Sequence, residues 1–205
     1  MNHATPELAA ALSTMLDRID ATLRQNSYQG PPIIMYLAGG MAVNYYCGTR
    51  VTRDVDASFS RRMALDYNDL IVDFVDATGK PTQLFFDTTY SPTLGPMHED
   101  YEDDSREWVG IGNEQRVVRL RVLAPVDVGV SKLGRFEGND RGDILALAAR
   151  GYFTAAEFRR RAEASASYFV GNVRRLQNTI DIVCKDIDDL GLVQASTPGV
   201  KQPSS

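Results

Sequence analysis

The chain has 205 residues, 43% of them hydrophobic, and a net charge of −5 at neutral pH, which together allow one globular domain with a full core and argue against a broad nucleic-acid-binding surface. Two cysteines and two histidines are too few for a zinc cluster, and we expect both cysteines to be free thiols. No apolar run reaches the roughly 18 residues of a membrane span, and the N-terminal residues lack the pattern of a secretory signal, so we expect a cytoplasmic protein.

Helices and strands are expected to alternate in the first part of the chain. Apolar residues at helical spacing predict a helix over residues 6–24. A buried strand is expected over residues 33–38, and a short helix over residues 40–46. A second strand, which carries an aspartate pair, continues over residues 55–59, and a second core helix is predicted over residues 66–77.

The middle of the chain has the pattern of strands separated by an irregular segment. A third strand is expected over residues 83–87. Residues 91–106 are acidic and contain proline and glycine, which favours irregular structure. Two further strands are expected over residues 108–111 and 117–123, and the second alternates apolar and basic residues as a half-exposed strand does.

The last third of the chain is helical in pattern, with helices expected over residues 126–136, 140–150 and 154–187. Thr154 is followed three residues later by Glu157, which is a capping-box pattern. This pattern predicts that the last of the three helices begins there.

Strands in the front of the chain and helices in the back predict an α/β (α+β) fold with a mixed sheet flanked by helices. Residues 1–124 would form the core, and residues 125–192 a helical C-terminal part packed on it. Residues 193–205 are polar and contain proline and glycine, which predicts a disordered tail.

Two glycines and two aspartates carry the strongest functional signal. Gly39 and Gly40 follow an apolar run, and Asp54 and Asp56 lie two residues apart in the strand pattern, where side chains point to the same face. Neighbouring carboxylates repel each other unless a cation lies between them, and Mg²⁺ takes such ligands together with substrate phosphates. Glycines let the backbone approach a phosphate and let a helix begin with free amides. Together these residues indicate a site for a metal-bound nucleoside triphosphate.

This pattern, Gly39-Gly40 followed by Asp54-x-Asp56, resembles the signature of the polymerase-β-type nucleotidyltransferase superfamily. A downstream block resembles one branch of that superfamily, which contains the AbiEii-type nucleotidyltransferase toxins of bacterial toxin–antitoxin pairs and related uncharacterised proteins. The residues that carry this second resemblance are Pro125, Asp127, Lys132, Leu133, Arg135, Asp140 and Asp143.

The resemblance implies a nucleotidyltransferase-like sheet and a definite chemistry. It implies transfer of a nucleoside monophosphate from an NTP to an acceptor hydroxyl, with Mg²⁺ or Mn²⁺ bound by Asp54 and Asp56. It further implies RNA such as tRNA as a candidate acceptor, and an antitoxin protein as a candidate partner. Whether the protein acts as a toxin depends on its gene context.

A third carboxylate is usual in such enzymes, as a metal ligand or as the base for the acceptor hydroxyl. Asp87, at the end of a predicted strand, is the best-placed candidate. Alternatively, Asp87 only begins a turn, a position that suits aspartate. Glu114 is a weaker candidate for the same role.

Lys132 and Arg135 are three residues apart on a predicted helix and would share a face. The resemblance implies that Lys132 contacts the triphosphate, whereas the alternative is a solvated basic face. Asp143 is expected to pair with one of these cations. Asp140 either caps the next helix or lies near the same groups.

Arginines elsewhere allow two interpretations. Arg53, beside the aspartate pair, either steers phosphates or balances local charge. The run Arg159-Arg160-Arg161 either contacts an RNA acceptor or forms a solvated helix face, and the solvated face is favoured. Met41 stands where many members of the superfamily carry a small hydroxyl residue, so one side-chain phosphate ligand is absent.

Two other functions compete with nucleotide transfer. A catalytically inactive module with the same fold would bind a nucleotide or a partner protein, although it would not need both Asp54 and Asp56. A metal-dependent nuclease of the restriction type needs an acidic residue two positions before a lysine. Lys80, Lys132 and Lys185 all lack it, so the nuclease ranks last.

Overall fold

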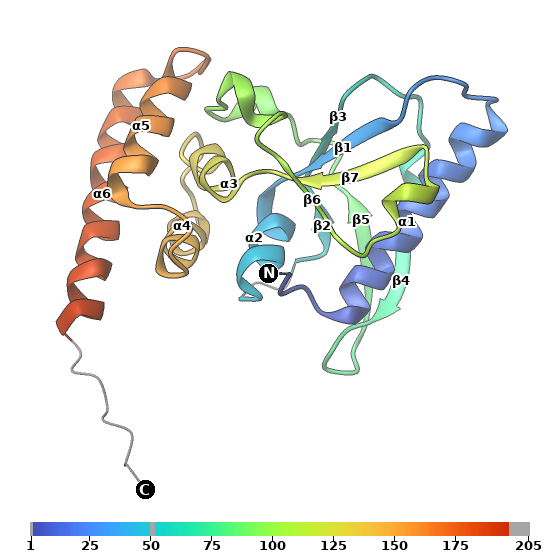
Figure 1. Ribbon diagram of the computed structural model, residues 1–205, viewed down its shortest axis with the longest axis horizontal. Coiled ribbons are helices and arrows are strands. Elements are labelled where there is room, and N and C mark those ends of the chain that lie inside the picture. Colours follow the sequence, from blue (N-terminus) through green and yellow to red (C-terminus); the bar gives the residue numbers. More distant parts are fainter. Residues whose placement is uncertain (1, 50–51, 197–205) are drawn as a thin grey trace, which may run out of the picture.

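The computed structural model describes residues 2–49 and 52–196, which form two β-sheets flanked by helices (Figure 1). This arrangement confirms the predicted α+β fold. None of the described helices is both long enough and apolar enough to cross a membrane. The α-helices are α1 (Pro6–Gln25), α2 (Gly39–Cys47), α3 (Pro125–Ser131), α4 (Asp140–Ala149), α5 (Ala155–Ala166) and α6 (Val173–Ser196). The strands are β1 (Ile33–Leu37), β2 (Asp54–Val55), β3 (Ala57–Phe59), β4 (Val72–Val75), β5 (Pro81–Phe86), β6 (Arg106–Glu107) and β7 (Val118–Val122).

Helix α1 forms as its sequence predicts. The Thr5 hydroxyl accepts a hydrogen bond from the amide of Leu8 (3.3 Å), and Pro6 occupies the first turn, where a missing amide proton costs nothing. One face of the helix packs against β4 and β7. The buried apolar side chains of that face are Leu8, Leu12, Met15, Leu16, Ile19 and Leu23.

Strand β1 lies inside the larger sheet, whose order is β3-β1-β7-β6. It runs parallel to β7, with Leu37 opposite Val122, and antiparallel to β3, with Leu37 opposite Ala57. Ile33, Met35 and Leu37 are fully buried. Because β1 is hydrogen-bonded on both edges and buried, its C-terminal end is a fixed point, and α2 begins there.

The smaller sheet contains β2, β5 and β4, in that order. Strand β2 runs parallel to β5, with Asp54 opposite Phe85. Strand β3 belongs to the larger sheet, so the strand predicted over residues 55–59 is split, and the chain passes from one sheet to the other at Asp56. The Ala38 amide donates to the Asp56 carbonyl oxygen (2.8 Å), which ties this crossing to the end of β1.

The helix predicted over residues 66–77 is wrong. Residues Tyr67–Leu70 form one 3-10 turn, η1, and Val72–Val75 form β4, which pairs antiparallel with β5. The apolar spacing in this segment fits a strand as well as a helix. Its β-branched and aromatic residues favour the strand once β5 is available as a pairing partner.

The C-terminal helices form a layer beside the sheets. Figure 1 shows α5 and α6 side by side at the edge of the molecule, with α3 and α4 between them and the strands. The capping box is confirmed: the Thr154 hydroxyl accepts from the Glu157 amide (3.2 Å), and the Glu157 carboxylate accepts from the Thr154 amide (2.8 Å).

The ends of other predicted elements differ from the structure. The single helix predicted over residues 154–187 is divided into α5 and α6 by a turn that contains Gly171. The strand predicted over residues 108–111 is replaced by β6, two residues earlier and shorter. Helix α6 continues to Ser196, past the predicted start of the tail, and residues 197–205 lie outside the described part of the chain.

Candidate active site

Three carboxylates meet where the two sheets adjoin. Asp54 begins β2, Asp56 lies between β2 and β3, and Asp87 directly follows β5. Because β2 and β5 are parallel neighbours, Asp56 and Asp87 follow their C-terminal ends side by side, and Asp54 lies two residues before Asp56. One oxygen atom from each carboxylate lies within 4.8 Å of one oxygen from each of the others. The structure thus brings the predicted pair together and adds Asp87 to it.

Asp87 also begins a turn, as the alternative interpretation expected. Its carboxylate accepts hydrogen bonds from the amide (2.8 Å) and the hydroxyl (2.7 Å) of Thr89. The turn leaves the carboxylate within reach of Asp56. The two interpretations of Asp87 are therefore compatible.

The crowding of the carboxylates shifts their proton affinities in opposite directions. Burial, followed by the charges of Asp54 and Asp87, raises the pKa of Asp56 to about 6, against a smaller opposing effect of Lys132. Burial also acts to raise the pKa of Asp87, but the two hydrogen bonds from Thr89 outweigh it and lower that pKa. Without a cation, Asp56 therefore holds a proton in a hydrogen bond with Asp87 in the weakly acidic range. Such a donor set fits a divalent cation, which would replace that proton.

Replacing Asp56 with Asn is expected to stabilise the metal-free protein by about 3 kcal/mol at pH 7.5, because the raised pKa of Asp56 means that its ionisation opposes folding. At pH values below about 4, the carboxyl is protonated in both the folded and the unfolded state, so its raised pKa lowers the free energy of unfolding very little. The free energy of unfolding falls as the pH rises through about 6, where Asp56 of the folded protein ionises. Urea denaturation of both proteins with a chelator at pH 4 and pH 7.5 measures this difference.

The exposed Asp188 of α6 supplies the control, as Asp188→Asn. Equal stability of wild type and the Asp56→Asn variant at pH 7.5, with the chelator present, would contradict the prediction. It would mean that the three carboxylates do not crowd one another in solution.

Gly39 fits the close approach of Asp56 to the start of α2. Its φ of +57° is a conformation that favours glycine, and a Cβ at this position would lie 2.7 Å from the Cβ of Asp56 and overlap its carboxylate. No described side chain caps the N-terminus of α2, so its first amides are available to an anion. Met41 is fully buried and fills the core below the helix.

Lys132 approaches the carboxylates from the end of α3. Only 7% of the residue is exposed, and its buried charge has two partners: the Nζ atom lies 2.7 Å from Asp143 Oδ2 and 3.3 Å from Asp140 Oδ1. The expected ion pair of Asp143 is thus present. Arg135, whose side chain is 71% exposed, lies 3.4 Å from Asp140. Burial opposes ionisation of Asp140, but the Glu137 amide and both cations lower its pKa.

These groups line one cavity of about 260 Å³. The helix predicted over residues 126–136 ends at Ser131, but Lys132 and Arg135 still face the same space. A wall of the cavity comes from the loop after β5, including Tyr90 and Leu94. Gly95 of this loop packs against the Ser131 carbonyl, so closely that a Cβ would lie 2.6 Å from its oxygen. The irregular sequence of this loop gave no sign of its role as a wall.

Several candidate residues lie elsewhere. Arg53 lines a separate hollow with Asn44 and Thr78, and not the cavity of the carboxylates. Glu114 lies exposed in a 3-10 turn, η4 (Asn113–Gln115), outside the carboxylate group. Asp143 supports Lys132 without lining the cavity.

Residues 14–188 match the model of a family described as "Nucleotidyltransferase of unknown function (DUF6036)". The match includes the three clustered carboxylates, both glycines and Lys132. No protein with a curated description matches the chain.

Proposed function

Because the chain belongs to this family of nucleotidyltransferases, we propose that it transfers a nucleoside monophosphate from an NTP to an acceptor hydroxyl, with Mg²⁺ or Mn²⁺ as the cofactor. The grouping of Asp54, Asp56 and Asp87 within 4.8 Å carries the proposal. In the reaction, the acceptor oxygen forms a bond to the α-phosphorus, and the bond from that phosphorus to the bridging oxygen breaks. Pyrophosphate leaves.

The residues of the cavity have two roles in this proposal, metal binding and triphosphate binding. Asp54, Asp56 and Asp87 would hold the divalent cation, which neutralises phosphate charge and orients the α-phosphorus. Lys132 and Arg135 bind the triphosphate electrostatically, and Asp140 and Asp143 hold Lys132 in place.

Two elements complete the site. The free amides at the start of α2 donate hydrogen bonds to phosphate oxygens. Asp87 has a lowered pKa and stays ionised, so its carboxylate can accept the hydrogen of the acceptor hydroxyl.

The acceptor and the partner are further parts of the proposal. The similarity of the Lys132 block to the AbiEii-type toxins supports RNA such as tRNA as the acceptor, and an antitoxin protein as the partner. A gene for a small protein next to the gene for this chain, and formation of a complex on co-expression, would test the partner.

Calorimetric titration of the four NTPs, with and without Mg²⁺, tests the nucleotide site. Wild type is expected to bind at least one NTP in a Mg²⁺-dependent manner. The Asp54→Asn/Asp56→Asn variant is expected to bind it about 100-fold more weakly, because it loses two charged metal ligands. The control is Asp188→Asn/Asp189→Asn, which removes the same charge from exposed positions of α6.

The outcomes separate the proposal from its alternative. If folded wild-type protein binds no NTP, the transferase proposal fails. Binding without transfer to any RNA or protein would favour the catalytically inactive module, in agreement with the absence of a hydroxyl side chain at Met41.

A further inference from the structure

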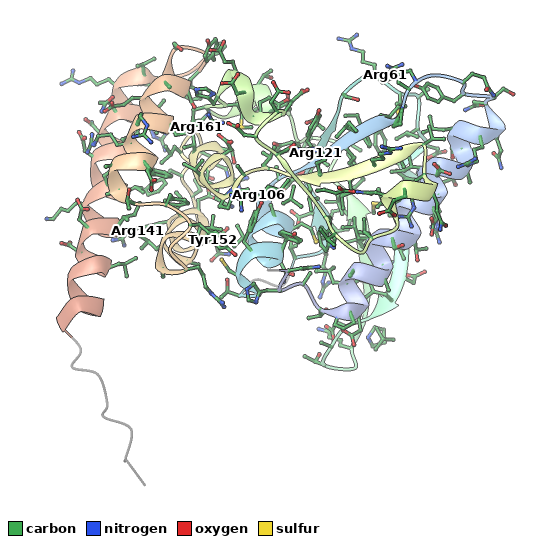
Figure 2. The ribbon with its side chains drawn as sticks, in the orientation of Figure 1. Arg61, Arg106, Arg121, Arg141, Tyr152 and Arg161 are labelled. Atoms are coloured by element: carbon green, nitrogen blue, oxygen red, sulfur yellow. The ribbon has the colours of Figure 1, made fainter. Side chains whose placement is uncertain are left out.

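A second cavity, of about 490 Å³, lies between the larger sheet and α5. Its walls include Arg106 of β6, Tyr152 after α4, and Arg160 and Arg161 of α5. Figure 2 shows Arg106, Tyr152 and Arg161 around α3, on the side of the helical layer. None of the catalytic groups proposed above lines this cavity.

Most charged groups of the second cavity already have partners. Arg161 donates two hydrogen bonds to the buried Asp127 (2.6 and 2.8 Å) and one to Asp104 (2.7 Å). Glu157 is held by the backbone and the hydroxyl of Thr154. Arg161, Asp104 and Glu157 therefore all have hydrogen-bond partners.

Two guanidinium groups of the lining make no close contact with a partner. Within residues 2–49 and 52–196, no hydrogen bond or close ion pair engages the side chain of Arg106 or Arg160, although the charge of Arg160 is near enough to Glu157 to contribute to the lowered pKa of that carboxyl. Arg160 belongs to the run for which a solvated face was expected. Arg159 pairs instead with Asp181 of α6 (2.6 Å) and is partly exposed there. Arg160 differs from it by facing the cavity.

The two cavities are neighbours on either side of α3. Val126, near the start of α3, lines the second cavity, and Ser131, at its end, lines the first. Five residues of helix separate them by about 8 Å along the helix axis. The loop before β6 joins them as well, with Met97 on the first cavity and His98 on the second. This spacing is short enough for a few nucleotides of a single strand to extend from one cavity to the other.

We propose that the second cavity binds the phosphate backbone of a single-stranded RNA acceptor, through Arg106 and Arg160. This inference rests on the proposed function, since it places the acceptor beside the nucleotide site. Guanidinium groups match phosphate oxygens in geometry. The half-buried ring of Tyr152 supplies a face on which a base can stack. A confined pair of cations in a chain of net charge −5 suits a strand end better than a duplex surface.

The test measures RNA binding without any NTP. A short fluorescein-labelled single-stranded RNA is titrated with protein, and its anisotropy is followed at several salt concentrations. Arg106→Ala/Arg160→Ala is expected to weaken binding about tenfold and to reduce the slope of log affinity against log salt by about 1.4, since two phosphate contacts are lost. The control, Arg61→Ala/Arg62→Ala, removes the same charge from the exposed loop after β3 and is expected to bind like wild type. Figure 2 shows Arg61 on the opposite side of the molecule from Arg161.

The results distinguish this inference from the proposed function. Mg²⁺-dependent NTP binding by the Arg106→Ala/Arg160→Ala variant should equal that of wild type, whereas Asp54→Asn/Asp56→Asn should keep its RNA affinity. If no NTP binds but RNA binding depends on the two arginines, the transferase proposal fails and the RNA site stands.

Three results would overturn the RNA site: no RNA binding by wild type, equal weakening by both arginine pairs, or competition by a mononucleotide as strong as that of the unlabelled strand at equal phosphate concentration. The last result would assign the cavity to a small anion. Acidic protein partners would be indicated if RNA failed and a polyglutamate peptide bound in its place.

Discussion

Replacing Asp87 with Asn is expected to lower the rate of nucleotide transfer about 1,000-fold, within the range for loss of a group that accepts a proton in the transition state. Asparagine keeps the shape of the side chain and can still accept the hydrogen bonds of Thr89. It cannot take up the hydrogen of an acceptor hydroxyl, and it brings no charge to the metal. Transfer of label from an α-³²P-labelled NTP to bulk RNA, under single-turnover conditions, measures the change.

The chain contains a matched control for this substitution. Asp76 forms the same kind of turn, with its carboxylate accepting from the amide (2.9 Å) and the hydroxyl (2.6 Å) of Thr78. It lies outside the carboxylate group. Asp76→Asn should therefore leave the rate unchanged. If Asp87→Asn also transfers at the wild-type rate, Asp87 is a turn residue and the site has only two functional carboxylates.

Replacing Arg161 with Ala is expected to lower the free energy of unfolding by about 3–5 kcal/mol, the cost of breaking a buried ion pair from one side. Its partner Asp127 has a side chain that is only 1% exposed. With the guanidinium removed, that carboxylate stays buried without its two hydrogen bonds from α5. The pair links α3 to α5, so its loss also weakens the packing of these two helices against each other. Urea denaturation measures the effect.

Arg159, two residues earlier on α5, is the matched control. It also makes an ion pair of 2.6 Å, with Asp181, but both side chains are partly exposed. Arg159→Ala should cost about 1 kcal/mol or less. The double variant Asp127→Leu/Arg161→Met should recover most of the lost stability, because an apolar pair leaves no buried charge. Equal losses for Arg159→Ala and Arg161→Ala would show that burial of the second pair contributes nothing.

Local sequence patterns predicted those parts of the structure that local chemistry determines. The cap, the proline and the apolar stripe of α1 are within one stretch of chain, as is the capping box at Thr154. The glycine pair and the two aspartates also indicated the place where the three carboxylates meet. Burial alternates along the segment, with Val55 buried and Asp54 and Asp56 half-buried, as the prediction of a shared face requires. The segment is not one continuous strand, however, because the chain passes from one sheet to the other at Asp56.

Features that depend on contacts between residues distant in sequence could not be predicted from local sequence patterns. The segment around η1 and β4 carries an apolar pattern that fits both a helix and a strand, and only β5 decides between them. Asp127 was part of a recognised block, but its partner Arg161 lies 34 residues later in a run that resembled a solvated face. The second cavity also joins segments that are distant in sequence. Arg160 and Arg161 belong to a run that was noted, but no pattern in the sequence linked that run to Arg106.

The contact between Gly39 and Asp56 restricts how this protein can evolve. A side chain at position 39 would overlap the carboxylate of Asp56, so any such substitution has to follow the loss or displacement of that aspartate. The reverse order is open, since a smaller residue at position 56 leaves the glycine unharmed. Among descendants of this chain, a lineage that has lost the carboxylate can later fill position 39, whereas one that keeps it cannot. The two positions are therefore expected to change in one order only, with Asp56 before Gly39.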